Sequence, residues 1–94
     1  MTGKERAGLR AMANTIQPIF QIGKGGISDT MIEQIGLALD ARELIKITVL
    51  ETAEISAREA SDQLCQALGA QPVQCIGRKI TIYRRNEKEP KIEL

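Results

Sequence analysis

Residues 22–27, with the sequence IGKGGI, restrict the fold of this 94-residue chain more than any other segment. They follow a short apolar run and precede a helical pattern that begins at Ser28, which predicts a strand, a tight turn and a helix in succession. The three glycines permit positive φ and allow a partner to approach the backbone closely. Backbone N–H groups at a helix start, beside the single cation Lys24, suit an anion, and phosphate is the commonest one.

Capping signals and hydrophobic spacing predict the other elements. Thr2 with Glu5, and Ser56 with Glu59, have the form of capping boxes at the start of two helices. We predict helices that begin near residues 3, 28 and 56, and strands over 19–22, 44–50, 73–76 and 80–84. The order α-β-α-β-α-β-β contains two helical crossovers, which imply parallel neighbouring strands, and a terminal hairpin. It predicts an α/β fold, an α+β sandwich, with a mixed four-stranded sheet and packed helices. The inner face of the third helix is predicted to consist of Ala60, Leu64, Ala67 and Leu68.

Length and composition indicate one globular domain. We place it at residues 1–85 and expect the charged tail at 86–94 to be frayed. Residues 2–14 are polar and amphipathic, unlike a signal peptide, and every apolar run is too short to span a bilayer. We therefore expect a monomeric cytoplasmic protein with no membrane association.

The residue types used in the commonest enzyme chemistry are scarce. The chain has no histidine, which removes the usual general base and the usual partner of a nucleophilic Ser or Cys. Its two cysteines, Cys65 and Cys75, cannot make a Cys₄ or Cys₂His₂ zinc site. We expect both to be small buried residues rather than a disulfide, which is rare in the cytosol. The sequence therefore predicts no enzyme activity, no metal and no cofactor.

Positive charge is concentrated at the two ends of the chain. The net charge is +3 over residues 1–24, −5 over 25–77 and +3 over 78–94. If the ends meet in the fold, the nearly neutral chain presents a basic face. Lys46 either joins this basic face and contacts its anionic partner, or is a strand residue whose charged end merely reaches solvent. The residues predicted to form the basic face are Arg6, Arg10, Lys24, Arg78, Lys79, Arg84 and Arg85.

Aromatic residues are too few for recognition by base stacking on a sheet. Phe20 and Tyr83 are the only two, and they cannot form the stacking platform of many single-strand binders. Recognition would then rest on phosphate, 2′-OH and shape, which favours structured RNA.

Several interpretations of residues 22–27 compete. The lysine comes too early for a mononucleotide P-loop. Gly23 and Gly25 match the dinucleotide fingerprint, but Ser28 occupies its third glycine position and the chain is too short for the second half of that fold. A turn without a ligand rarely needs three glycines and does not need a lysine. The sequence favours a KH-like GxxG loop, Gly23-Lys24-Gly25-Gly26, which clamps a nucleotide backbone.

Several separated motifs resemble, in order and spacing, those of the CRM domain, which is named for chloroplast RNA splicing and ribosome maturation. The resemblance spans residues 2–85 and is closest in length to the stand-alone bacterial YhbY-like proteins. One departure is Arg42, where many relatives carry histidine. The matching positions are Thr2, Arg6, Leu9 and Arg10, then Pro18, then residues 22–26, 43–47 and 76–84.

The resemblance implies an RNA-binding domain similar in fold to the C-terminal domain of translation initiation factor three. It also implies a role in assembly of the large ribosomal subunit, because the bacterial members are associated with precursors of that subunit. The family's GxxG loop corresponds to Gly23, Lys24, Gly25 and Gly26. We therefore predict binding to structured ribosomal RNA or a pre-ribosomal particle. A nucleotide-binding enzyme or sensor and a protein-interaction adapter are the alternatives.

Overall fold

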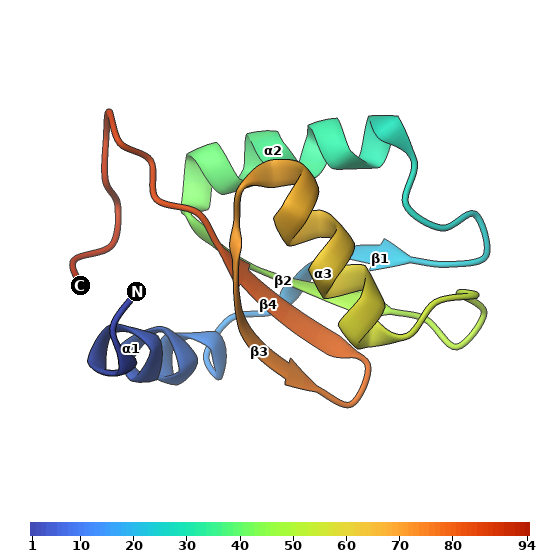
Figure 1. Cartoon of the computed structure of the whole chain (residues 1–94), viewed down its shortest axis with the longest axis horizontal. Coiled ribbons are helices and arrows are strands. Elements are labelled where there is room, and N and C mark those ends of the chain that lie inside the picture. The colour runs from blue at the N-terminus through green and yellow to red at the C-terminus, as the bar shows by residue number, and fades with distance from the viewer.

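The computed structural model describes all 94 residues and contains three helices and one four-stranded sheet (Figure 1). The predicted order of elements and the predicted α+β class with a mixed sheet are confirmed. None of the helices combines the length and the hydropathy that a membrane crossing requires. In chain order the elements are α1 (Gly3–Ala13), β1 (Pro18–Ile22), α2 (Asp29–Arg42), β2 (Leu44–Val49), α3 (Ala57–Leu68), β3 (Gln71–Ile76) and β4 (Lys79–Tyr83).

Side-chain caps begin α1 and α3 where the sequence predicts. The Thr2 hydroxyl accepts a hydrogen bond from the Glu5 N–H at 3.1 Å, and the Glu5 carboxylate accepts one from the Thr2 N–H at 2.9 Å. Ser56 and Glu59 make the same reciprocal pair at the start of α3. These bonds satisfy amides that the first turn of a helix leaves without a partner. Gly69 ends α3 in the left-handed conformation, with φ at 65°.

The strands lie in the order β1-β2-β4-β3. β1 and β2 are parallel neighbours connected through α2, as the sequence predicts. The prediction that the second crossover also joins parallel neighbours is wrong, because β4 lies between β2 and β3 and is antiparallel to both. Burial explains this order. Four consecutive residues of β4 are buried, residues 80–83, whereas β3 buries only Val73 and carries Pro72, which suits an edge strand.

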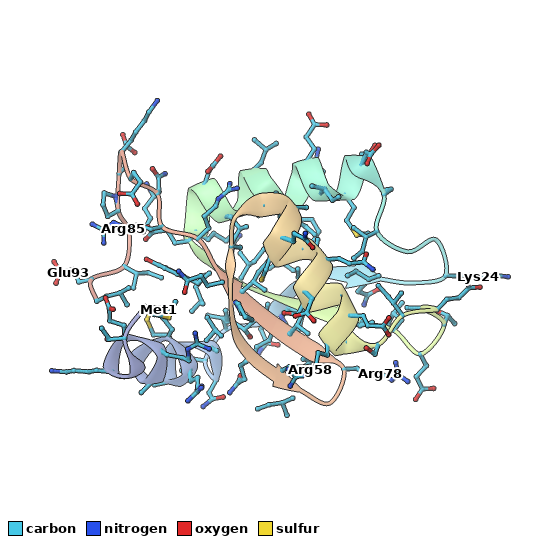
Figure 2. The ribbon with its side chains drawn as sticks, viewed as in Figure 1. Met1, Lys24, Arg58, Arg78, Arg85 and Glu93 are labelled. Carbon is cyan, nitrogen blue, oxygen red and sulfur yellow. The ribbon has the colours of Figure 1, made fainter.

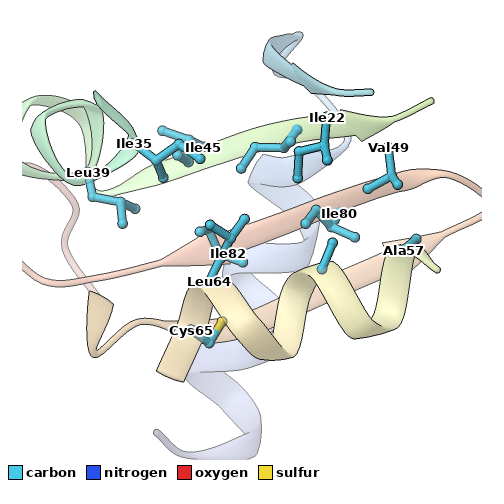
Figure 3. Close-up of a cluster of buried hydrophobic side chains, with 12 residues drawn as sticks. Ile22, Ile35, Leu39, Ile45, Val49, Ala57, Leu64, Cys65, Ile80 and Ile82 are labelled. Atoms are coloured by element: carbon cyan, nitrogen blue, oxygen red, sulfur yellow. The ribbon is translucent and has the colours of Figure 1, made fainter. Parts of the chain in front are cut away.

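Alternation of side chains along β2 gives the sheet two different faces. Ile45, Ile47 and Val49 lie on the face covered by α2 and α3, where Ile80 and Ile82 of β4 join them in the main core. In Figure 3, α3 lies on the near side of the sheet and α1 on the far side. The period-2 pattern therefore decides which side chains of β2 face the main core and which face the α1 side.

The opposite face of the sheet is covered only at one end. There Leu9 of α1 packs against Leu44, Val73 and Tyr83 in a second, smaller core. Next to Leu44 on this face come Lys46 and Thr48, which are half-buried rather than buried. The sheet therefore has one sealed face and one face that α1 covers in part.

Two sequence-based predictions of burial are wrong. Ala67 is exposed, because it lies at the margin of the inner stripe of α3, and Ser61 and Cys65 are buried on that stripe instead. Cys75 is exposed on the edge strand β3, whereas Cys65 is buried, and both are free thiols. Gly36 of α2 packs closely against α3, since a Cβ added there would lie 3.3 Å from Leu68 Cδ2.

Glu43 is a fully buried residue that forms the whole connection between α2 and β2. Its φ is +64°, a value that residues other than glycine seldom adopt. Its N–H bonds to the Leu39 carbonyl at 2.8 Å, and its own carbonyl accepts the Arg84 N–H at 2.9 Å. This backbone conformation therefore ends α2, begins β2 and ties the connection to the end of β4.

The Glu43 carboxylate also holds the C-terminal tail. It accepts hydrogen bonds from the backbone N–H groups of Asn86, Lys91 and Ile92, at 2.7, 2.6 and 2.6 Å. The tail has no helix or strand, yet Ile92 packs against the smaller core. The charge of the tail predicts a frayed segment, whereas these hydrogen bonds and the packing of Ile92 hold it against the domain.

Despite burial, this network of hydrogen bonds lowers the pKa of Glu43. Burial raises the pKa of the carboxyl, but the bonds from Asn86, Lys91 and Ile92 lower it by more, so the pKa lies below its ordinary value of 4.5. The charged form of Glu43 is therefore the form that stabilises the fold.

We expect Glu43→Gln to lower the free energy of unfolding by about 1–3 kcal/mol at pH 7, because an amide facing three N–H donors leaves some of them unpaired. The depressed pKa means that the carboxylate stabilises the fold above its ordinary pKa and loses this effect as the pH falls through the folded-state pKa. The difference between wild type and variant should therefore shrink in acid.

Denaturant unfolding at pH 7 and at about pH 3 measures both effects. Glu33→Gln, at an exposed position of α2, removes the same charge without removing a hydrogen bond and serves as the control. Equal stability of wild type and Glu43→Gln at pH 7 would contradict the role assigned to the carboxylate.

Candidate nucleic-acid interface

The glycine loop, residues 23–26, is a tight turn that projects Lys24 away from the protein. The Gly26 N–H bonds to the Gly23 carbonyl at 2.9 Å, and Gly26 has a φ of +70°. Nothing lies within 4 Å of a Cβ added at Gly25. Figure 2 shows Lys24 at the outermost end of the molecule, with its side chain directed into solvent. The turn itself therefore requires glycine at position 26 but not at position 25.

The start of α2 directly after the loop is already capped. The Ser28 hydroxyl accepts the Met31 N–H at 3.1 Å, and Asp29 lies in the first turn. These groups offset part of the positive end of the helix dipole. An anion at this end would therefore depend on the loop amides and on Lys24.

The turn of the β3–β4 hairpin lies at the same end of the sheet as the glycine loop. The Leu50 N–H bonds to the Ile22 carbonyl at 2.8 Å, and the Val49 N–H bonds to the Arg78 carbonyl at 2.7 Å. Both turns therefore flank the end of β2. The Arg78 side chain lies 4.0 Å from a carboxylate oxygen of Glu51, and both side chains are at least half exposed, so this ion pair leaves Arg78 accessible.

Two lysines lie on the part of the sheet that α1 leaves uncovered. In the register of β2 and β4, Lys46 pairs with Thr81 and Thr48 pairs with Lys79, so both lysines belong to the α1 side of the sheet. Lys46 is half-buried and Lys79 is exposed. Neither forms an ion pair. We call this uncovered region, with Lys46, Thr48 and Lys79, the open face.

Arg6 and Arg10 of α1 belong to a second feature, a cleft of about 440 Å³ along the edge strand β3. Arg58, Ser61 and Asp62 of α3 complete its lining with residues 72–76 of β3. The Arg10 side chain donates a hydrogen bond to the Val73 carbonyl at 3.4 Å. Three arginines from two helices thus face one acid. We call this feature the arginine cleft.

Arg58 is the residue of this cleft that sequence reasoning missed. It lies in the acidic middle of the chain, so the charge pattern along the sequence gave no reason to choose it. Only the placement of α1 and α3 on either side of β3 brings Arg58 to the arginines of the first helix.

Arg84 and Arg85 differ in what their side chains contact. The Arg84 guanidinium donates hydrogen bonds to the carbonyls of Leu68 and Gly36 and to the Asp40 carboxylate, each at 2.9 Å. It therefore ties β4 to the two helices of the main core. Arg85 pairs with Glu87 at 3.7 Å and lies at the opposite end of the molecule from Lys24 (Figure 2). The basic residues thus form no single cluster: Lys24, Arg78 and Lys79 lie near one end of the sheet, and Arg85 lies at the other.

No group of three His, Cys, Asp or Glu side chains is placed to hold a metal ion. The arrangement instead offers cations, exposed backbone amides and a partly open sheet face. Such a set of groups can bind a polyanion through its phosphates.

Comparison with known proteins identifies the family. A family model described as the CRS1 / YhbY (CRM) domain matches residues 1–84. The chain belongs to this family. The resemblance inferred from the sequence motifs is thereby confirmed, and it covers nearly the whole chain.

Relatives of this CRM domain carry names that refer to RNA. Over 94 residues, all of this chain and 98% of the relative, it is 44% identical to "Probable RNA-binding protein YqeI" of Bacillus subtilis. It is 34% identical to "Probable RNA-binding protein MJ0652" of Methanocaldococcus jannaschii, over 93% of this chain and 66% of that protein. Its fold is similar to the solution structure of the hypothetical protein SAV1595 from Staphylococcus aureus, with a TM-score of 0.82 and 46% identity over 100% of this chain and 98% of that one.

Two glycines of the CRM domain's loop should respond differently to alanine. Gly26→Ala places a side chain at φ +70° and should lower the free energy of unfolding by about 1–2 kcal/mol. Gly25→Ala points a methyl group into open space and should change stability by less than about 0.5 kcal/mol. Denaturant unfolding of both variants measures the difference, and equal losses would contradict the turn geometry.

Proposed function

We propose that this CRM domain binds structured RNA of the large ribosomal subunit and acts in the assembly of that subunit. The observation that carries the proposal is the exposed glycine loop, with Lys24 at its tip, at the end of a sheet face that carries further lysines. The names of the relatives support RNA as the class of partner. The ribosomal role rests on the association of stand-alone bacterial CRM proteins with large-subunit precursors.

The glycine loop would bind the RNA backbone by close approach. Because Gly25 has no side chain and no residue other than its chain neighbours lies within 4 Å of its Cβ position, a phosphate can come into contact with the turn. Lys24 then neutralises part of the phosphate charge, and backbone N–H groups donate to its oxygens. The glycine at position 25, which the turn does not need, is explained by the partner rather than by the fold.

The RNA-binding surface of the protein would extend from the glycine loop in two directions. Arg78 and Lys79 continue it to the hairpin turn, and Lys46 continues it across the open face. Around the edge strand, the arginine cleft adds Arg6, Arg10 and Arg58. Arg84 does not belong to this RNA-binding surface, because its guanidinium donates hydrogen bonds to groups within the protein. Arg85 would be reached only by an RNA that runs along the 36 Å length of the molecule.

Binding of this kind requires no catalytic group and no cofactor. Phosphate contacts position an RNA, and its A-form shape and 2′-OH groups distinguish it from DNA. We propose that the protein acts as a cytoplasmic monomer. Of the two alternatives, the nucleotide-binding one fits the loop less well, because Ser28 occupies the third glycine position of the dinucleotide fingerprint and its hydroxyl caps α2.

Lys24→Ala should weaken binding to a structured fragment of large-subunit ribosomal RNA by about three- to tenfold and should reduce the slope of log affinity against log salt by about one. The thermal midpoint should stay the same, because the Lys24 side chain makes no hydrogen bond or ion pair within the protein. Fluorescence anisotropy titrations at several salt concentrations measure both quantities.

Lys88→Ala is the matched control for this variant, because it removes one exposed lysine from the tail, which lies beside Asp40 and Arg85 at the other end of the molecule from the glycine loop. The control should bind RNA as the wild type does. If the two variants lose affinity equally, the loop has no special role and only the overall charge matters.

The ribosomal part of the proposal requires a test in cells. Ultraviolet crosslinking of the protein to RNA, followed by sequencing, should give reads concentrated on large-subunit ribosomal RNA, and Lys24→Ala should reduce them relative to Lys88→Ala. Reads spread over messenger and transfer RNA would refute the ribosomal role. Ribosome association that survives both high salt and RNase would favour a protein-interaction adapter instead.

A further inference from the structure

An apolar groove of about 400 Å³ lies between the C-terminal part of α1, the starts of β1 and β2, and the tail. Six of its nine lining residues are hydrophobic, although the side chains of Leu44 and Ile45 are buried in the two cores: Met12, Ile16, Ile19, Leu44, Ile45 and Ile92. Three polar residues complete the lining: Gln17, Arg42 and Lys46. The groove adjoins the open face, because Lys46 belongs to both.

Two apolar side chains that line this groove remain partly exposed to solvent. Met12 and Ile19 remain 38% and 39% exposed, although both are large apolar side chains. Apolar surface that a folded monomer leaves concave and accessible usually marks a binding site. The groove is therefore a candidate for an occupant with an apolar surface of its own.

The charges at the groove indicate what kind of occupant fits. Arg42 and Lys46 are its only charged lining residues, and neither has an acidic partner within 4.0 Å. The site thus combines aliphatic walls with two uncompensated cations. A nucleotide has the complementary pattern, since its base presents flat apolar faces and its phosphates are anionic.

No exposed aromatic side chain is available to stack on an RNA base. Tyr83 is 4% exposed and Phe20 is half-buried against the main core, so neither offers a free ring to an RNA base. Proteins that read RNA sequence mostly bind bases that are splayed out of bulges and loops. Here an aliphatic groove is the available place for such a base.

We propose that the groove receives one unstacked base of the bound RNA, while Arg42 and Lys46 contact the phosphates on either side of it. The inference rests on the proposed function and makes it more specific, because it adds recognition of an unpaired nucleotide to binding of the RNA backbone. It also assigns a role to Arg42, which lines the groove and forms no ion pair. Lys46 becomes a contact rather than a strand residue that merely reaches solvent.

Two RNA hairpins test the proposal with the whole protein. One has a single bulged 2-aminopurine in its stem, and the other has the same stem fully paired. We expect wild type to bind the bulged hairpin about five- to tenfold more tightly, as burial of one base would give. The fluorescence of 2-aminopurine should rise on binding, since it is quenched by stacking on neighbouring bases and released in an aliphatic site.

Ile19→Ser should remove the preference for the bulged hairpin and the fluorescence rise, while its affinity for the paired hairpin stays at the wild-type value. Leu37→Ser is the matched control, because Leu37 is a 58% exposed apolar residue on α2 that does not line the groove. Thermal unfolding checks that both variants fold. If Ile19→Ser does not, Met12→Gln replaces it, since Met12 is equally accessible.

The outcomes separate this inference from the proposed function. Equal wild-type affinity for the two hairpins, with no fluorescence change, would overturn the base-binding groove and leave RNA binding intact. Absence of binding to either hairpin would also overturn the base-binding groove, and absence of binding to the large-subunit ribosomal RNA fragment as well would refute the proposed function. A dimer in analytical ultracentrifugation that Ile19→Ser converts to a monomer, without any preference for the bulged hairpin, would assign the groove to a second copy of the chain and overturn the proposal.

Discussion

The structure depends on Glu43, a buried carboxylate at a one-residue turn with φ at +64°. Its backbone joins α2 to β2 and bonds to the end of β4 at Arg84, and its carboxylate fixes the tail through three backbone N–H groups. A buried charge is unfavourable unless hydrogen bonds compensate it, and here main-chain donors supply that compensation. The conformation that costs strain at one residue is thus stabilised by contacts from three separate parts of the chain.

The position of the tail has consequences for the surface that we propose binds RNA. Ile92, which Glu43 holds in place, packs with Leu9 and Leu44 on the side of the sheet that α1 covers. Together α1 and the tail close one end of this face and leave Lys46 and Lys79 uncovered beyond them. The same arrangement forms the apolar groove at the boundary between covered and open parts. A contact made for stability therefore delimits the candidate interface.

Features that depend on neighbours in the sequence were predictable. The caps at Thr2 and Ser56, the glycine turn and the hairpin follow from residues at most a few positions apart, and the structure has all of them. Features that depend on distant packing were not. The contacts of Arg84 with α3 and α2 span 16 and 48 residues of the chain, and the cleft brings Arg58 to Arg6 and Arg10 of α1. Charge along the sequence cannot separate an arginine that binds inside the protein from one that lines a cleft.

The sequence by itself determined the order of elements, the mixed sheet, the position of the glycine loop and the family, because these follow from local hydrogen bonding, side-chain periodicity and motif spacing. The tertiary structure alone decided the strand order, since burial of residues 80–83 places β4 between β2 and β3. It also decided which cations share a surface. Lys24 and Arg85 are both exposed and basic, yet they lie at opposite ends of the molecule, because the direction in which each strand crosses the sheet sets where its ends emerge.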